Sequence, residues 1–265
     1  MLNFSNIGGL NIKVDTSEAR GEYEKWHLAR FQLADEDFLS APWHKMVIDN
    51  LPCLAGKRIL EVATGEGALS RYLARRGAKV FAVDFSHMAI SEAQKRSRCR
   101  KFRVRYVQAD LQSLPFRNDS FDIVVSCETL EHLEHPERGI RELVRISRNR
   151  GEFVLTTPNY FNLMGFALIY RKLMGKDIRL FGQPIDHPFL FFRVLHLLKK
   201  FKVKVLKTEA RRVLQVPLPK RRPLCIQAFE SAKVRTIFKY FGFHFFIYGR
   251  VCKYGEAKAY NCSRW

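Results

Sequence analysis

Three acidic residues and a glycine turn, spread over the first half of the chain, are residue types that could bind a nucleoside. Gly65 and Gly67 flank a tight turn directly after a short apolar run that contains Glu61. Asp84 ends the next apolar run, and Asp110 follows a third. An acid at the end of the second run can accept both hydroxyls of a ribose, and one after the third can accept from an adenine amino group. Any one of these carboxylates alone would be typical of a solvated loop, but together the three are placed as a nucleoside-binding site requires.

The spacing of apolar residues predicts the elements that position this set. Strands are expected at 57–62, 78–83, 102–108, 122–126 and 152–156, and helices at 67–76, 86–98 and 136–147. Gly77 is expected to close the first helix, and Ser86 to cap the second. Strands that alternate with helices indicate a doubly wound parallel sheet, with helices on both faces. Ligands of such sheets bind beyond the carboxyl ends of the strands, where the three acids fall.

The remaining segments are less regular. Residues 20–50 have helical, amphipathic spacing that Pro42 interrupts, and residues 159–180 are apolar and basic with helical spacing. Further elements are expected as helices at 189–201 and 229–241 and strands at 202–207 and 244–252.

The loop around Gly65 also carries a family resemblance. The run Ile59-Leu60-Glu61-Val62-Ala63-Thr64-Gly65-Glu66-Gly67 resembles the first motif of class I S-adenosylmethionine-dependent methyltransferases of the type 11/23 group. Residues 80–84, 108–116 and 120–126 resemble the motifs that follow it, in the same order and spacing. The resemblance runs from about residue 57 to 159. It implies a Rossmann-like sheet of seven strands whose last strand is antiparallel.

The resemblance also implies roles for single residues and S-adenosylmethionine as the cofactor. Asp84 would bind the ribose hydroxyls, while Asp110 and the Leu111 backbone would hold the adenine, with Phe85 packed against its ring. The methionine end and the sulfonium would be lined by the remaining cofactor residues, Glu61, Ala63, Gly65, Gly67 and Cys127.

One position of the loop departs from the family pattern. Ala63 stands where the family has the first glycine, which an alanine tolerates if its φ is negative. A dinucleotide site is the main competing interpretation, but Ser70 occupies the place of its third glycine, and that interpretation leaves Asp110 unexplained.

The acceptor end is expected just after the fourth strand. Glu128, Glu131 and His132 have spacings that a helical turn would bring to one face. The pattern resembles the magnesium-binding segment of the ubiquinone-biosynthesis O-methyltransferases and of small-RNA 2′-O-methyltransferases, with His187 as a further candidate ligand. Three interpretations stay open: local packing, a general base at His132, or a divalent cation held by Glu128, Glu131, His132 and His187.

Charge is distributed unevenly. Residues 1–150 hold 24 Lys and Arg against 20 Asp and Glu, whereas residues 151–265 hold 22 against 6. The second part is therefore the expected contact for an anionic partner, either a membrane surface or RNA. Six cysteines without metal-site or disulfide spacing, and no signal-peptide pattern, favour a cytoplasmic protein, with peripheral membrane association as an option.

These observations combine into one prediction for the whole chain. We expect an N-terminal helical cap at 1–50 and a methyltransferase domain at 51–265, with a basic acceptor-side insertion at about 159–188 and a basic connection at about 208–225. The expected reaction is O-methylation of a small sugar-, lipid- or quinone-precursor-like acceptor. The alternatives are an RNA 2′-O-methyltransferase and a non-catalytic S-adenosylmethionine-binding protein.

Overall fold

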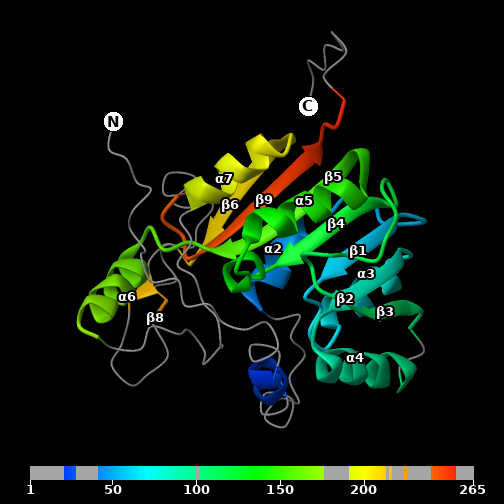
Figure 1. The fold of residues 1–265 in the computed structure, drawn as a ribbon, viewed down its shortest axis with the longest axis horizontal. Coiled ribbons are helices and arrows are strands. Elements are labelled where there is room, and N and C mark those ends of the chain that lie inside the picture. The colour runs from blue at the N-terminus through cyan, green and yellow to red at the C-terminus, as the bar shows by residue number, and fades with distance from the viewer. Residues whose placement is uncertain are drawn as a thin grey trace.

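A seven-stranded sheet forms the centre of the computed structural model (Figure 1). The structure describes residues 21–27, 41–99, 102–175, 191–212, 215–216, 224–225 and 240–254. The sheet has the order β3-β2-β1-β4-β5-β9-β6. Its strands are β1 (Arg58–Val62), β2 (Lys79–Asp84), β3 (Val104–Gln108), β4 (Phe121–Cys127), β5 (Ser147–Pro158), β6 (Val203–Arg211) and β9 (His244–Val251).

Helices flank the sheet, and a two-stranded ribbon lies apart from it (Figure 1). The helices are a short one at 21–27, α2 (Pro42–Asn50), α3 (Ala68–Arg75), α4 (His87–Cys99), α5 (Pro136–Ile146), α6 (Leu163–Leu173) and α7 (Phe191–Lys200). The ribbon pairs β7 (Gln215–Val216) with β8 (Leu224–Cys225).

Strand pairing confirms the predicted topology. The first five strands pair in parallel, and β9 pairs antiparallel with both β5 and β6. The chain winds outward from β1 through β2 to β3, then returns to place β4 on the other side of β1. The gap between the ends of β1 and β4 is therefore the point where the strand order reverses, at which such sheets bind ligands.

The two faces of the sheet carry separate apolar cores. Alternate residues of β1 illustrate this, since Leu60 and Val62 pack with α5 and α7, whereas Ile59 packs with α2 and α3. All three side chains are at most 1% exposed. Burial on both faces explains why the central strands read as nearly continuous apolar runs.

The predicted caps of two helices are confirmed. Gly77 adopts φ +87° just after α3, the left-handed conformation that ends helices. The Ser86 hydroxyl accepts a hydrogen bond from the backbone N–H of Ala89 at 3.1 Å, in the N-cap geometry for α4.

Several boundaries differ from those expected. Pro42 begins α2, because proline fits the first turn of a helix, where its missing N–H has no partner to lose. The strand β5 starts at Ser147, which pairs with Phe121 of β4, and β6 runs to Arg211, which pairs with His244 of β9. The helix expected at 229–241 lies almost wholly outside the described residues, as do most of the segment 1–40 and residues 176–188 of the predicted insertion.

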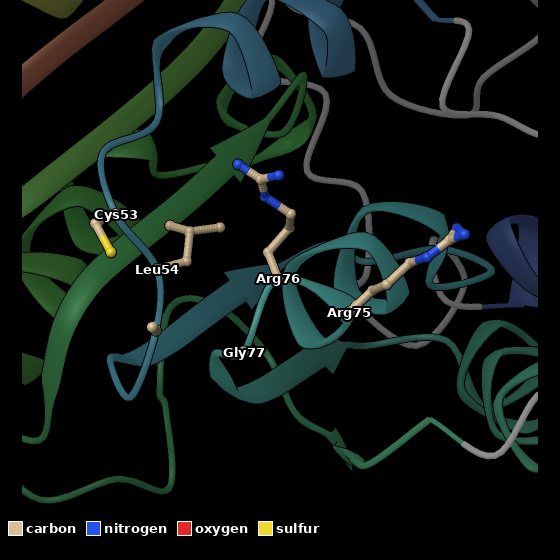
Figure 2. A pocket seen from close by; sticks show the side chains of 6 residues that line it. Cys53, Leu54, Arg75, Arg76 and Gly77 are labelled. Atoms are coloured by element: carbon tan, nitrogen blue, oxygen red, sulfur yellow. The ribbon is translucent and has the colours of Figure 1, made fainter.

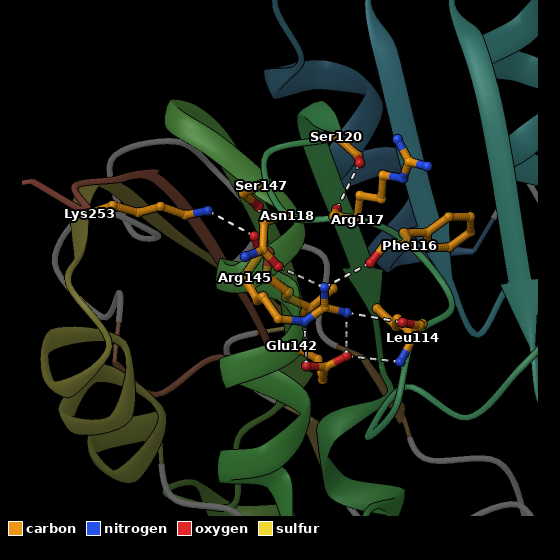
Figure 3. A network of polar contacts seen from close by, with 10 residues as sticks. Leu114, Phe116, Arg117, Asn118, Ser120, Glu142, Arg145, Ser147 and Lys253 are labelled. Atoms are coloured by element: carbon orange, nitrogen blue, oxygen red, sulfur yellow. Dashed lines mark hydrogen bonds and ion pairs between the residues drawn. The ribbon is translucent and has the colours of Figure 1, made fainter.

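A polar network fixes the loop that leads into β4 (Figure 3). The Arg145 guanidinium on α5 donates to the carbonyls of Leu114 at 3.0 Å and Phe116 at 2.7 Å, while Glu142 accepts from the Leu114 N–H at 2.8 Å. Arg145 and Glu142 also pair with each other. Backbone groups outside the sheet thus find partners, and β4 enters the sheet from an anchored start.

Candidate functional site

The predicted cofactor residues meet at the carboxyl edge of the sheet. Glu61 lies near the end of β1, Asp84 ends β2, and Cys127 ends β4. Asp110 is the second residue after the end of β3. Parallel pairing brings these ends to one edge, as the sequence predicted.

The loop after β1 has left-handed backbone at three positions. Ala63, Gly65 and Gly67 have φ of +52°, +54° and +78°. The condition under which an alanine is tolerated here, a negative φ, is therefore not met: Ala63 occupies a left-handed conformation that a glycine would adopt at lower cost. Its side chain is exposed, so packing does not compensate for the strain. Strained residues of this kind cluster at ligand sites.

The two glycines of the loop serve different purposes. A Cβ on Gly67 would stand 2.5 Å from the Tyr106 hydroxyl and 3.1 Å from the Cβ of Ala93, so Gly67 is needed for close packing under the loop. A Cβ on Gly65 would meet nothing within 4 Å. The open space beside Gly65 is a cradle in which a ligand can approach the backbone.

Glu61 is a buried carboxylate beneath this loop. Its side chain accepts hydrogen bonds from the Thr64 hydroxyl at 3.1 Å and from the Ser70 hydroxyl. Burial raises the pKa of Glu61 to about 7, although the hydrogen bonds from Ser70 and Thr64 oppose the rise. Because this pKa is close to neutral pH, a cation placed beside the carboxyl group would readily shift it to the ionised form. Ser70 and Thr64 were not expected to contribute to the site.

Asp84 links the first loop to the second strand. Its Oδ2 accepts from the Gly65 N–H at 2.9 Å, and its Oδ1 accepts from the Ser86 N–H at 3.0 Å. Burial raises the pKa of Asp84, while the nearby His27 opposes that rise. The carboxylate is thus fixed in direction, with lone pairs left for hydroxyl donors.

The residues predicted for the adenine side are held by local contacts. The Oδ1 of Asp110 accepts from the Gln112 N–H at 2.8 Å, and Leu111 is buried. The Phe85 ring packs edge-on against Tyr23, with centroids 5.1 Å apart.

The helix at 21–27, which falls within the predicted helical cap, covers this edge of the sheet. The sequence did not predict which part of the domain this helix contacts. Glu24 accepts hydrogen bonds from the backbone N–H groups of His87 at 2.6 Å and Met88 at 2.9 Å, and from the Ser86 hydroxyl at 2.9 Å. It therefore supplies a carboxylate to the N-terminus of α4 from far away in the sequence. Tyr23 also lies 6.2 Å from the His132 ring, so this helix spans from the adenine side to the acceptor side.

The acceptor end differs from its prediction. A single 3₁₀ turn, η3 (Leu130–His132), replaces the expected helical turn, and Glu128 precedes it with φ +46°. Glu131 is buried beside His132, 3.6 Å from its Nε2. Glu128 instead faces His244 at the start of β9, with 3.3 Å between Oε2 and Nδ1. The idea that Glu128, Glu131 and His132 share one helical face is therefore wrong.

No metal centre is assembled within the described part of the chain. Among those residues, no group of three or more His, Cys, Asp or Glu side chains is arranged to hold an ion. His187, the fourth predicted ligand, lies outside the described residues. Cys127 is buried, and this burial raises the pKa of its thiol well above the usual range, so the thiol is neutral.

A pocket of about 450 Å³ lies at the opposite edge of the sheet (Figure 2). Its lining comes from the segment before β1 and from the end of α3 with the turn that follows it, including Cys53, Arg75 and Arg76. Those segments precede the strands, so this pocket is separate from the edge that carries the predicted cofactor residues.

Comparison with known proteins assigns the chain to a family. Residues 60–155 match a family model described as "Methyltransferase domain". A demethylmenaquinone methyltransferase of Thermus thermophilus is 30% identical over 155 residues, which cover 58% of this chain and 70% of that protein. The chain belongs to the S-adenosylmethionine-dependent methyltransferases. S-adenosylmethionine is accordingly the cofactor of this methyltransferase.

Other similarities are consistent with this assignment. A ubiquinone biosynthesis O-methyltransferase of Coxiella burnetii is 33% identical to this methyltransferase over 51% of the chain and 59% of that protein. The putative methyltransferase in a Haloferax volcanii complex with the activator Trm112 has a TM-score of 0.62 at 19% identity, covering 89% of this chain and 98% of that one. The match to that structure shows the shared fold. The chain spans about half the length of two other demethylmenaquinone methyltransferases, at 53% and 56%.

Proposed function

We propose that this methyltransferase transfers the methyl group of S-adenosylmethionine to an oxygen of a small acceptor. The observation that carries the proposal is the hydrogen bond between the Gly65 loop and Asp84, beside the point where the strand order reverses. Glu61 below the loop and Asp110 beside it complete the set. A free cradle at Gly65 fits a ligand that lies against the backbone.

In this proposal, different residues around Gly65 bind different parts of the cofactor. Asp84 binds the ribose hydroxyls, because its carboxylate is fixed by two backbone N–H groups. Asp110 and Leu111 hold the adenine beside Phe85. The methionine end and the sulfonium lie against the remaining predicted residues, Glu61, Ala63, Gly65, Gly67 and Cys127.

The cofactor supplies an activated methyl group, so the protein has three tasks. It must align the acceptor oxygen, exclude water and accept the hydroxyl proton. The helix at 21–27 covers the edge and so excludes water from it. Imidazoles at the acceptor end favour oxygen over carbon or nitrogen as the methylated atom, and His132 is the base that the sequence predicted.

The acceptor is proposed to be a lipid-linked or quinone-precursor-like molecule. Relatives named for menaquinone and ubiquinone methylation support this class. Helix α6 and the residue that follows it support this class as well, since they expose four large apolar side chains at one-face spacing: Phe166, Tyr170, Leu173 and Met174. Exposed Arg171 beside them, on the basic half of the chain, suits an anionic lipid surface. Within the described residues no helix is long and apolar enough to cross a bilayer.

The proposal is tested by methyl transfer from labelled S-adenosylmethionine to a panel of hydroxyl acceptors. The panel contains 3,4-dihydroxybenzoate as a catechol, menadiol as a quinol and an alkyl glucoside as a sugar lipid. Labelled methyl ether should form with at least one class. Binding of S-adenosylmethionine without transfer to any of them would instead favour the non-catalytic alternative.

A further inference from the structure

The second imidazole of the acceptor end is His244, which stands at the start of β9. It is only 2% exposed, and its Nδ1 lies 3.3 Å from the Oε2 of Glu128. Among the residues that the structure describes, neither Nε2 of His244 nor Oε1 of Glu128 has a hydrogen-bond partner. Burying a polar atom without a partner is unfavourable, so a buried pair with both outer atoms unpaired suggests that a ligand completes it.

The backbone around His244 is held on both sides. His244 pairs with Pro158 of β5 and with Arg211 of β6. Asn159 further anchors the approach to β9, since its side chain donates to the carbonyls of Tyr240 at 2.7 Å and Gly242 at 3.1 Å. The imidazole therefore projects from a rigid element, as a group that must meet a reacting atom requires.

Glu128 is held just after the end of β4, which β5 separates from β9 in the sheet. Its backbone N–H donates to the Thr156 carbonyl at 3.0 Å, and its φ of +46° is a strained value for glutamate. This conformation turns the residue after β4 toward β9 rather than into the 3₁₀ turn. Strain of this kind at a ligand-binding edge is typical of functional residues.

We propose that His244 is the base that takes the proton of the acceptor hydroxyl, with Glu128 as its positioning residue. This inference rests on the proposed O-methyl transfer. An Nδ1–H that donates to Glu128 leaves the Nε2 lone pair free to accept a proton. The acceptor oxygen forms its bond to the methyl carbon while the carbon–sulfur bond breaks and its electron pair stays on sulfur. The hydroxyl proton moves to Nε2, and the Glu128 carboxylate balances the imidazolium charge.

His132 is less suited to this task. Its Nε2 already lies 3.6 Å from the buried Glu131, and its ring is packed near Tyr23. The ring of Trp43, on α2, lies 5.3 Å from that of His244 and is only partly buried.

The test measures methyl transfer by His244→Asn, Glu128→Gln and the surface control His196→Asn, using catechol and 4-nitrocatechol as acceptors. Catechol must lose its proton during the reaction, whereas 4-nitrocatechol is already largely ionised at neutral pH. His244→Asn should lower kcat for catechol about 100-fold, with a much smaller loss for 4-nitrocatechol. Glu128→Gln should show the same pattern less strongly, and S-adenosylhomocysteine affinity should be unchanged. A purely structural role would reduce both acceptors equally.

The results that would overturn the inference can be told apart from a failure of the proposed function. If His244→Asn methylates catechol at the wild-type rate, the inference is overturned and the proposed function stands. The same holds if only His132→Asn loses methyl transfer to catechol. If the wild type methylates neither catechol nor any hydroxyl of the wider panel, the proposed function fails together with the inference. Should His244→Asn not fold, imidazole added to His244→Gly must restore catechol transfer, and no restoration counts against the assignment.

Discussion

The backbone N–H of Gly65 donates to the Oδ2 of Asp84 at 2.9 Å, so the glycine loop after β1 and the acid at the end of β2 form one unit. Their separation in the sequence gives no direct sign of this contact. It explains why a change in the loop should disturb the acid that is proposed to bind ribose. The predictions below follow from this unit and its neighbours.

Gly65→Ala should mainly weaken cofactor binding, whereas Gly67→Ala should mainly lower the free energy of unfolding. Both carry the strain of alanine at positive φ, about 1 kcal/mol each. Gly67→Ala also collides with Tyr106 and Ala93, so its free energy of unfolding should fall further, by roughly 1–3 kcal/mol more. Gly65→Ala places a methyl in open space, so it should fold but lose S-adenosylhomocysteine affinity. Urea unfolding and calorimetry on both variants check this, and equal stability losses would contradict it.

Ala63→Gly should stabilise the protein. The alanine has φ +52° and an exposed side chain, so glycine relieves strain without losing packing. We expect a gain of roughly 0.5–1 kcal/mol in the free energy of unfolding, measured by urea denaturation. A loss of stability would mean that the loop does not adopt this conformation in solution.

Glu61 should make stability fall as pH rises toward neutrality. Its pKa is about 7 in the folded protein against an ordinary value of 4.5, so the folded state holds the proton more tightly. The folded state then loses stability between about pH 4.5 and 7, by roughly 3 kcal/mol in total. Glu61→Gln should remove this slope. Urea unfolding of the wild type and the variant between pH 5 and 8 gives the slope of the free energy of unfolding against pH for each protein. Equal slopes would contradict the argument that burial raises the pKa of Glu61.

The same carboxyl should couple cofactor binding to protons. If the cationic methionine end lies beside Glu61, as proposed, binding favours the ionised carboxylate and releases a proton below about pH 7. Affinity for S-adenosylmethionine should therefore rise with pH and level off above 7. Calorimetry in buffers of different ionisation enthalpy measures the released proton. Absence of release in the wild type, or identical release from Glu61→Gln, would place the methionine end elsewhere.

Glu24→Ala should loosen the helix at 21–27. The variant removes acceptors from two N–H groups at the start of α4 and from the Ser86 hydroxyl. The expected loss is about 1 kcal/mol, with faster hydrogen exchange at residues 86–89. The surface variant Glu22→Ala, in the same helix, is the matched control and should change neither quantity. Unaltered exchange in Glu24→Ala would mean that the two helices are not linked.

The sequence was sufficient for the cofactor edge because its signals are local. Glu61 lies within an apolar run, Asp84 ends one and Asp110 follows one, and parallel pairing then aligns them without further information. The cover by residues 21–27 depends instead on single contacts such as that between Glu24 and Ser86, which no periodicity encodes. The sequence did not identify His244 as a candidate site residue for a related reason. A histidine at the start of a strand is common, and only the fold places this one beside Glu128.

The failed prediction at the acceptor end has a physical cause as well. Spacing alone allowed Glu128, Glu131 and His132 to share a helical face. The left-handed backbone at Glu128 and its N–H bond to Thr156 keep this residue in line with the sheet, so only one 3₁₀ turn follows. A charged residue with positive φ is rare enough that sequence spacing could not have indicated it.

The central claim is that the Gly65 loop and Asp84 bind S-adenosylmethionine, and calorimetry with S-adenosylhomocysteine tests it most directly. The wild type should bind in a 1:1 complex, and Asp84→Ala should weaken binding by about 100-fold or more, because the ribose hydroxyls lose a charged acceptor. The matched control Asp122→Ala, on β4 at the opposite edge, should bind as the wild type does. No binding by the wild type, or equal binding by Asp84→Ala, would contradict the account.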